Sequence, residues 1–169
     1  NGSKKIMGSS TKTAKQMASY FSKTGHDFPA STYSDRGASD IGAFCKIIEE
    51  EASSEGVRAD IVFAQAMHET GWLQFGGSVT AKQCNFAGIG ATSATVGGAS
   101  FKDVRTGIRA QVQHLKAYAS KGSLNHACVD PRFSKVTRGC APLVTDLNGK
   151  WAVPGTGYGE SILKIINSI

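Results

Sequence analysis

The sequence lacks any apolar run near the roughly 18 residues needed to cross a membrane, so we expect no spanning helix. It also lacks the charged and then apolar leader of a secretory signal, which a secreted form would already have lost. Charged residues make up only 19% of the chain, and there are 4 prolines in 169 residues. Hydrophobic residues reach 40%, which excludes wholesale disorder and predicts a soluble globular protein.

The 4 cysteines lack the close pairing of a structural zinc site, because none forms a Cys-x-x-Cys motif. We expect no metal and no other cofactor. Cys45 falls on the apolar stripe of a predicted helix, which favours a buried free thiol. Cys128 and Cys140 bracket a short segment that contains proline and glycine, and this spacing leaves both a disulfide and two free thiols open.

The basic residues are not clustered in the sequence, although the net charge is +6 and the pI is about 9.2. Lys4-Lys5 is the longest basic run, and no zinc-finger or arginine-rich pattern appears. We therefore expect no nucleic-acid partner. A basic surface of this kind suits either a polyanionic cell wall or simple solvation, and a monomer is the default expectation.

Apolar residues recur at helical spacing in five segments. The third of them is apolar nearly all round, which predicts a central, buried helix. The glycine-rich stretch 71–100 predicts loops with a short hairpin near 91–101, and residues 121–156 are irregular. The chain is therefore predicted to be mainly α, with a long loop region that walls a cleft. The five predicted helices cover residues 11–23, 39–54, 59–70, 104–120 and 158–169.

The segment 26–37 contains Pro29 and several serine, aspartate and glycine residues, which is typical of a linker. We place a domain boundary at its end. Residues 1–37 then form an N-terminal helical arm and linker, and residues 38–169 form the main domain. The arm is too short for a core of its own, so we expect it to dock on the main domain.

Glu69 stands out because it ends the apolar third helix. Burial raises the pKa of a carboxyl group, and the negative end of the helix dipole acts in the same direction. A carboxyl group that stays protonated near neutral pH is the general acid that glycoside hydrolysis requires. The alternative is a salt-bridged or solvated glutamate at a helix end.

His68 and Glu69 together look like the start of a zinc-peptidase motif. That motif requires a second histidine at position 72, where this chain has Trp72, so the metallopeptidase interpretation is excluded.

Aromatic and amide side chains gather in the glycine-rich region after Glu69. Trp72, Phe75 and Phe86 offer ring faces that stack on sugars, although packing in the core is the commoner role of such residues. Gln74 and Asn85 offer amides that hydrogen-bond hydroxyl and acetamido groups. We predict a substrate-binding role for these five residues.

Four stretches taken together resemble the glucosaminidases of glycoside hydrolase family 73. The similarity covers about residues 40–169 and is greatest to the catalytic domains of clostridial-type cell-wall autolysins. The stretches are residues 64–72 (AQAMHETGW), 85–89 (NFAGI), 101–118 (FKDVRTGIRAQVQHLKAY) and 157–166 (GYGESILKII).

This resemblance implies a lysozyme-like α+β fold, in which a helical domain and a small β-hairpin lobe form a cleft. It implies hydrolysis of the β-1,4 bond that follows N-acetylglucosamine in peptidoglycan. Glu69 corresponds to the catalytic acid of the family. Tyr158 corresponds to a tyrosine that lies in the cleft near the reacting sugar, and we include it among the predicted catalytic residues.

The chain departs from the family where some members carry a second acidic residue, because residues 90–100 contain no aspartate or glutamate. Asp103 is a candidate base, but it stands where it would cap the next helix. Asp146 and Glu160 are more distant candidates. Without a second carboxylate, either the substrate's 2-acetamido group or a water held near Tyr158 attacks the anomeric carbon.

The resulting hypothesis is a secreted cell-wall endo-β-N-acetylglucosaminidase that acts on peptidoglycan glycan strands, as an autolysin in wall turnover or daughter-cell separation. Two rivals remain: a muramidase or lytic transglycosylase of lysozyme-like fold, and a non-catalytic wall-binding module. Residues 88–98 are either a mobile cleft wall or an ordinary surface loop.

Overall fold

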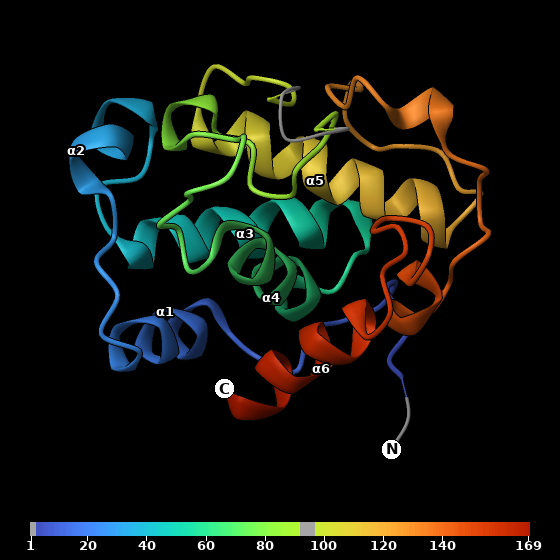
Figure 1. Cartoon of the computed structure of the whole chain (residues 1–169), viewed down its shortest axis with the longest axis horizontal. Helices are drawn as coiled ribbons and strands as arrows, with labels where there is room; N and C mark the ends of the chain where they lie inside the picture. Colours follow the sequence, from blue (N-terminus) through green and yellow to red (C-terminus); the bar gives the residue numbers. More distant parts are fainter. Residues whose placement is uncertain (1–2, 92–96) are drawn as a thin grey trace.

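Helices joined by long loops make up most of residues 3–91 and 97–169, which the computed structural model describes (Figure 1). Four short 3₁₀ turns lie in the loops, at Ser34–Arg36, Ala81–Gln83, Phe133–Lys135 and Val144–Leu147. No helix in the described part of the chain is both long enough and apolar enough to span a membrane. The α-helices are α1 (Ala14–Lys23), α2 (Ala30–Tyr33), α3 (Ile41–Glu55), α4 (Ala59–Thr70), α5 (Val104–Ala119) and α6 (Tyr158–Ser168).

The five predicted helices are all present, with ends set by local capping. α1 begins three residues later than predicted because Thr13, not Thr11, caps it: the Thr13 hydroxyl accepts from the Gln16 backbone N–H at 3.2 Å. α3 begins at Ile41 because the Asp40 carboxylate accepts from the Ala43 N–H at 2.8 Å. α4 has the predicted bounds.

α4 lies at the centre of the molecule, end-on between α3 and α6 (Figure 1). Every residue of α4 except His68 and Glu69 is buried, which confirms the prediction of a central helix. A helix surrounded in this way meets solvent only at an end. The last turn of α4 is therefore the one part of it that a ligand can reach.

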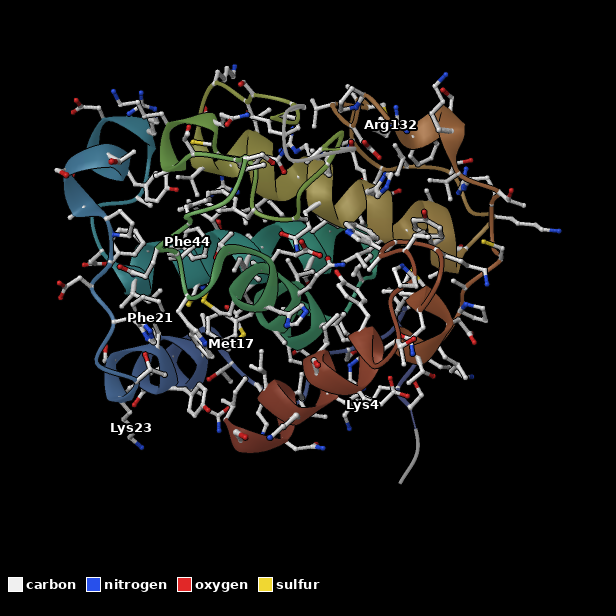
Figure 2. The ribbon with its side chains drawn as sticks, in the orientation of Figure 1. Lys4, Met17, Phe21, Lys23, Phe44 and Arg132 are labelled. Carbon is white, nitrogen blue, oxygen red and sulfur yellow. The ribbon has the colours of Figure 1, made fainter. Side chains whose placement is uncertain are left out.

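The first helix packs onto α3 and closes one side of the core. Met17 and Phe21 point from α1 toward α3, the helix that carries Phe44 (Figure 2), and all three side chains are buried. The segment after α1, predicted as an irregular linker, contains α2 and is also packed. Tyr33 is completely buried, and its hydroxyl donates to the Ala81 carbonyl at 2.9 Å. This aromatic anchor outweighs the turn-forming composition of residues 26–37, and the division at residue 37 stays a prediction.

The predicted hairpin over residues 91–101 is not shown, because residues 92–96 lie outside the described part of the chain. Within residues 3–91 and 97–169, β structure is limited to isolated bridges such as Lys5 with Leu143 and Met7 with Val57. The Ala99 N–H donates to the Ile89 carbonyl at 2.9 Å, which joins the two sides of the loop. The chain is mainly helical, and a β lobe remains a prediction.

The four cysteines are free thiols. Cys45 is buried on α3, as predicted, and burial raises the pKa of its thiol. Cys128 is exposed and Cys140 is partly exposed, and the disulfide considered for this pair is not formed.

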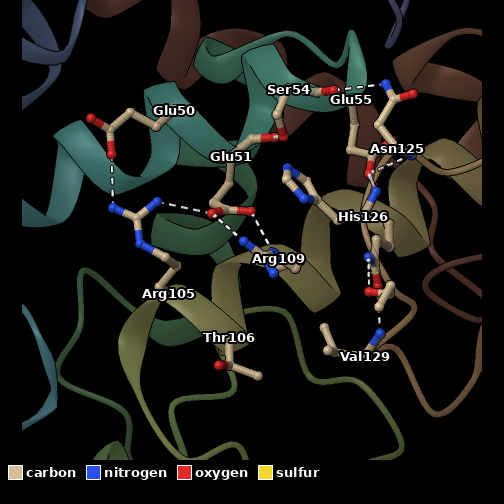
Figure 3. Close-up of polar contacts among 12 residues, drawn as sticks. Glu50, Glu51, Ser54, Glu55, Arg105, Thr106, Arg109, Asn125, His126 and Val129 are labelled. Carbon is tan, nitrogen blue, oxygen red and sulfur yellow. Dashed lines mark hydrogen bonds and ion pairs between the residues drawn. The ribbon is translucent and has the colours of Figure 1, made fainter.

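A buried glutamate joins α3 to α5 (Figure 3). Glu51 accepts from the Arg105 guanidinium at 2.9 Å and from two nitrogens of Arg109 at 2.8 and 3.0 Å. Burial alone would raise the pKa of Glu51, but the two guanidinium groups reverse this effect and hold it below its usual range. Glu50, one residue earlier, makes an exposed pair with Arg105 at 2.7 Å.

A second buried glutamate, one helical turn further along α3, ties down the chain after α5. Glu55 accepts from Lys116 Nζ at 3.0 Å and from the backbone N–H groups of Asn125 and His126 at 2.9 to 3.0 Å. These donors outweigh the effect of burial and lower the pKa of Glu55. The first part of the irregular region after α5 is thereby anchored to the helical core.

Glu51→Gln should destabilise the fold by about 1.5–3 kcal/mol at neutral pH, because it replaces a buried carboxylate that binds two guanidinium groups. The folded-state pKa of Glu51 is lowered, so its contribution is present above the ordinary glutamate pKa of about 4.3 and lost as the pH falls below that value. Urea unfolding of wild type and variant between neutral and acid pH should therefore show a difference that shrinks on acidification. Glu50→Gln is the matched control and should cost less than about 1 kcal/mol. Equal losses for the two variants would contradict this account.

Candidate active site

A pocket of about 270 Å³ lies at the C-terminal end of α4. Its lining comes from the last turn of α4, from the loop 71–79 and from the loop 85–91. Glu69, Phe75, Asn85 and Gly88 are among the lining residues. Two glycine-rich loops therefore form the walls around the single end of α4 that is not buried.

Glu69 reaches this pocket because α4 ends immediately after it. Gly71 takes the left-handed conformation (φ 59°) that terminates the helix. Burial raises the pKa of the Glu69 carboxyl group, and the hydrogen bond from Tyr158 only partly opposes this effect. A glutamic acid with a raised pKa holds its proton at higher pH than an ordinary glutamate, as the sequence predicted from its apolar helix.

Tyr158 is the direct partner of Glu69. It is the first residue of α6, it is buried, and its hydroxyl donates to Glu69 Oε2 at 2.5 Å. Burial and the neighbouring carboxylate raise the pKa of Tyr158 well above its usual value, so the hydroxyl remains a donor. The structure thus brings together the two residues that the sequence predicted to be catalytic, from positions 89 residues apart.

The two oxygens of Glu69 have different surroundings. Oε2 is held by Tyr158, whereas no residue in the described part of the chain hydrogen-bonds to Oε1. Oε1 lies beside Gly88, where a Cβ atom would stand only 3.3 Å away, and Gly88 has a φ of +67°. A glycine at this position keeps the pocket side of Oε1 open to a ligand.

Two buried glutamines fix the direction of the Tyr158 hydroxyl. Gln65 Nε2 donates to the Tyr158 oxygen at 2.9 Å, and Gln111 Nε2 donates to Gln65 Oε1 at 3.0 Å and to the Val62 carbonyl at 3.0 Å. An amide nitrogen can only donate, so the Tyr158 proton must point to Glu69. This chain of donors runs from α5 through α4 and α6 to the carboxyl group.

Gln65 and Gln111 were given no functional role from the sequence. Both are completely buried on helices whose neighbouring side chains are apolar. The sequence did contain one indication of a role for Gln65: it lies four residues before Glu69 and therefore on the same face of α4.

His68, the other α4 residue that is not buried, lies edge-on to the Tyr158 ring with centroids 5.3 Å apart. Burial lowers the pKa of His68, which favours a neutral ring. No group of three or more metal-ligating side chains occurs among residues 3–91 and 97–169.

Of the five residues predicted to bind substrate, Phe75 and Asn85 line the pocket. The Phe75 side chain is partly exposed there. Asn85 is only 1% exposed, and its amide pairs with both the N–H and the carbonyl of Ile89, at 3.0 and 2.9 Å. Asn85 therefore holds the loop 85–91 in shape, and its amide is already occupied within the protein.

The other three, Trp72, Gln74 and Phe86, are not among the described residues that line the pocket. The Trp72 ring packs against aromatic rings of α1 and α4. Gln74 is exposed and donates to the backbone carbonyls of Asp27 and Trp72 at 2.9 Å. Phe86 is completely buried, edge-on to Phe44 with centroids 5.0 Å apart, so neither face of its ring meets solvent.

Glu69 is the only acidic side chain among the described residues that line the pocket. Asp103 caps α5 by accepting from the Thr106 N–H at 2.8 Å, and the Thr106 hydrogen bonds outweigh burial and lower the pKa of Asp103. Asp146 accepts from the Leu143 N–H, and Glu160 is exposed and accepts from Asn148. These three carboxylates thus have local structural partners.

Residues 45–169 match the family model Glucosaminidase, described as mannosyl-glycoprotein endo-beta-N-acetylglucosaminidase. The chain belongs to this family. The match confirms the resemblance to the family 73 glucosaminidases. It includes Glu69, Tyr158 and the two buried glutamines.

The chain is also similar to an uncharacterized protein of Borreliella burgdorferi, with 48% identity over 126 residues. The similar region covers 75% of this chain and 61% of that protein, so the chain spans less than two thirds of this relative's length. No solved structure matches the chain.

Tyr158→Phe should raise the pKa of Glu69 further, because the carboxyl group stays buried but loses the hydrogen bond that favours its charged form. Carbon-13 NMR titration of carboxyl-labelled glutamate measures this directly, with the Glu69 signal assigned from its absence in Glu69→Gln. Tyr20→Phe on α1 is the control, because Tyr20 does not line the pocket and does not hydrogen-bond to Glu69, and it should leave that pKa unchanged. A fall in the Glu69 pKa on removal of the Tyr158 hydroxyl would refute the assigned direction of the hydrogen bond.

Proposed function

We propose that this glucosaminidase is an endo-β-N-acetylglucosaminidase that hydrolyses the β-1,4 bond between N-acetylglucosamine and N-acetylmuramic acid in peptidoglycan, with Glu69 as the general acid. The observation that carries the proposal is the state of Glu69. Its pKa is raised by burial, one oxygen is held by Tyr158, and the other faces a walled pocket. A positioned, protonated carboxyl group of this kind donates a proton to a glycosidic oxygen.

In the proposed reaction, the Glu69 proton passes to the bridging oxygen as the bond from that oxygen to the anomeric carbon breaks. The sugar on the leaving side keeps the oxygen as its 4-hydroxyl group. Tyr158 holds the carboxyl group in position by donating to its other oxygen, and Gln65 in turn orients the Tyr158 hydroxyl by donating to it. Tyr158 thereby contributes to the acid step by orientation.

The opposite face of the anomeric carbon needs a nucleophile, and we propose that the substrate's 2-acetamido oxygen fills this role. Two observations favour this route over a second carboxylate. The described lining of the pocket contains no acid besides Glu69, and residues 90–100 contain none at all. The acetamido oxygen forms a cyclic intermediate, which water opens while Glu69 takes up the proton of the water. Two displacements at one carbon retain its configuration.

Retention is testable by proton NMR of the first reducing-end product from a soluble peptidoglycan oligosaccharide. The β-anomer of N-acetylglucosamine should form first and then mutarotate. Initial α-anomer would show inversion, and would instead support direct attack by a water held near Tyr158.

We further propose that the enzyme acts as a secreted autolysin in the cell wall, in wall turnover or daughter-cell separation. The net charge of +6 supports this location, because a basic protein is attracted to polyanionic wall polymers. The rival activities differ in their products. A muramidase or a lytic transglycosylase leaves muramic ends, and a non-catalytic wall-binding module leaves the wall intact.

The deciding experiment digests purified peptidoglycan with the wild type and with Glu69→Gln, reduces the products with borohydride and identifies the new ends by mass spectrometry. We expect N-acetylglucosaminitol ends from the wild type, and a rate lower by about 10²–10⁴-fold for the variant, because it lacks the acid. Muramitol or anhydromuramic ends would overturn the bond assignment. Wall binding without any cleavage by the wild type would favour the binding module.

The same variant provides its own folding control. The pKa of Glu69 is raised in the folded state, so above the ordinary glutamate pKa its ionisation opposes folding. In Glu69→Gln, the amide oxygen of the new side chain would accept the Tyr158 proton without that penalty. The variant should therefore melt at or above the wild-type temperature at neutral pH, with the difference vanishing below about pH 4. A lower melting temperature would mean that the loss of activity reports misfolding.

A further inference from the structure

A second pocket, of about 170 Å³, adjoins the Glu69 pocket across the backbone of residues 88–91. Gly88 and Ala91 line both pockets, so a chain-like ligand that lies at Glu69 can extend into the second one. The far wall of the second pocket comes from α5 and from the loops that follow it. We call it the basic pocket, because Arg132 and Lys150 line it together with His114, Tyr118 and Trp151.

The two cations of the basic pocket are not neutralised by the protein. Among residues 3–91 and 97–169, neither the Arg132 guanidinium nor the Lys150 ammonium makes an ion pair. The nearby acid, Asp130, is buried and already occupied: one of its oxygens lies 2.7 Å from His114 Nδ1 and the other accepts from the Arg132 backbone N–H at 2.9 Å. By contrast, Arg105 and Arg109 on α5 are both paired with Glu51. The pocket therefore offers positive charge to a ligand.

The aromatic wall of the basic pocket is held rigidly. Trp151 Nε1 donates to the Ala87 carbonyl at 3.1 Å, which ties the indole to the loop that also lines the Glu69 pocket. The His114 ring stands edge-on to Trp151 with centroids 4.6 Å apart, and Tyr118 lies 5.7 Å from it. Trp151 is partly exposed, so this fixed indole presents apolar surface beside the two cations.

An apolar ring next to unpaired cations, one step along the cleft from Glu69, matches a sugar that carries a carboxylate. Of the two sugars in the proposed substrate, N-acetylglucosamine is neutral, whereas N-acetylmuramic acid carries a lactyl group that is either a free carboxylate or extended by a peptide with carboxylates of its own. We propose that the basic pocket binds this acidic branch of muramic acid, with Arg132 and Lys150 on a carboxylate and Trp151 against the sugar or the branch. The inference rests on the proposed function for the identity of the substrate.

Binding to the Glu69→Gln variant tests this inference without turnover, by calorimetry with two ligands of equal length. One is chitotetraose, which contains only N-acetylglucosamine, and the other is a peptidoglycan tetrasaccharide with its peptides. Arg132→Gln and Lys150→Gln, each added to Glu69→Gln, should weaken binding of the peptidoglycan ligand about tenfold or more and change chitotetraose binding by less than about twofold. Equal weakening for the two ligands, or no weakening, would overturn the proposal.

Lys23→Gln is the charge-matched control, because Lys23 is exposed at the end of α1, at the lower edge of the view in Figure 2, whereas Arg132 lies at its upper edge. It removes the same charge and should leave the affinities for both ligands unchanged. If it weakened peptidoglycan binding as much as Arg132→Gln does, the effect would come from net charge alone, and the proposed binding role of the basic pocket would be refuted. Melting temperatures of all variants establish that they fold.

A third ligand distinguishes the lactyl carboxylate from the carboxylates of the peptide. This ligand is the same tetrasaccharide after an amidase has removed its peptides. If this ligand keeps the sensitivity to Arg132→Gln, the lactyl carboxylate is the group bound. If only the intact ligand shows it, the carboxylates of the peptide are bound. These binding measurements are independent of the product analysis. If the basic pocket does not bind the acidic branch, N-acetylglucosaminitol ends are still expected from the digest. If the digest gives other ends, the affinities of the variants can still be measured.

Discussion

The near-complete burial of α4 is the constraint on which the rest of the structure depends. A helix that is apolar nearly all round must be covered nearly all round. α3 and α6 pack against it, and Ser10 and Thr11 of the N-terminal segment hydrogen-bond to its first turn. Only the last turn, with His68 and Glu69, is left to face the loops. The position of the candidate active site is thus a consequence of how the core is packed, and the raised pKa of Glu69 follows from the same burial.

The two buried glutamates of α3 have charged and N–H partners, whereas the buried Gln111 Oε1 has no hydrogen-bond partner among the described residues. Glu51 and Glu55 are matched by cations and N–H groups from α5 and the loop after it, and their pKa values are lowered. Glu69 is the contrasting case, since its one described partner is a neutral hydroxyl and its pKa is raised. The fold therefore holds two kinds of buried carboxyl group: those whose charge is matched and that join α3 to α5, and one at the end of α4 whose charge is not matched.

The helices could be predicted from the sequence because apolar periodicity is a strong local signal. Glu69 was singled out by its apolar helix and Tyr158 by the family resemblance, whereas the hydrogen bond between them was not predicted. The aromatic residues after Glu69 could not be assigned in this way. Trp72 and Phe86 are residue types that often stack on sugars. In this fold the Trp72 ring packs against α1 and the Phe86 ring against α3. Of the three aromatic residues, Phe75 is the one that lines the pocket. Gln65 and Gln111 were not predicted, because a single buried amide on a helix is not distinguished by apolar periodicity from an exposed one. The basic pocket joins residues from α5 and two later loops, a grouping that exists only in three dimensions.

Glu69 and Tyr158 are separated by 89 residues, and the tyrosine belongs to the last helix. When the whole of α4 has been synthesised, 88 residues (158 minus 70) still have to be added before Tyr158 exists. Glu69 in the nascent chain therefore lacks the hydroxyl group that donates to it, and so does a chain that is cleaved before residue 158. The hydrogen bond between the two residues can form only after α6 has been made and has docked on α4.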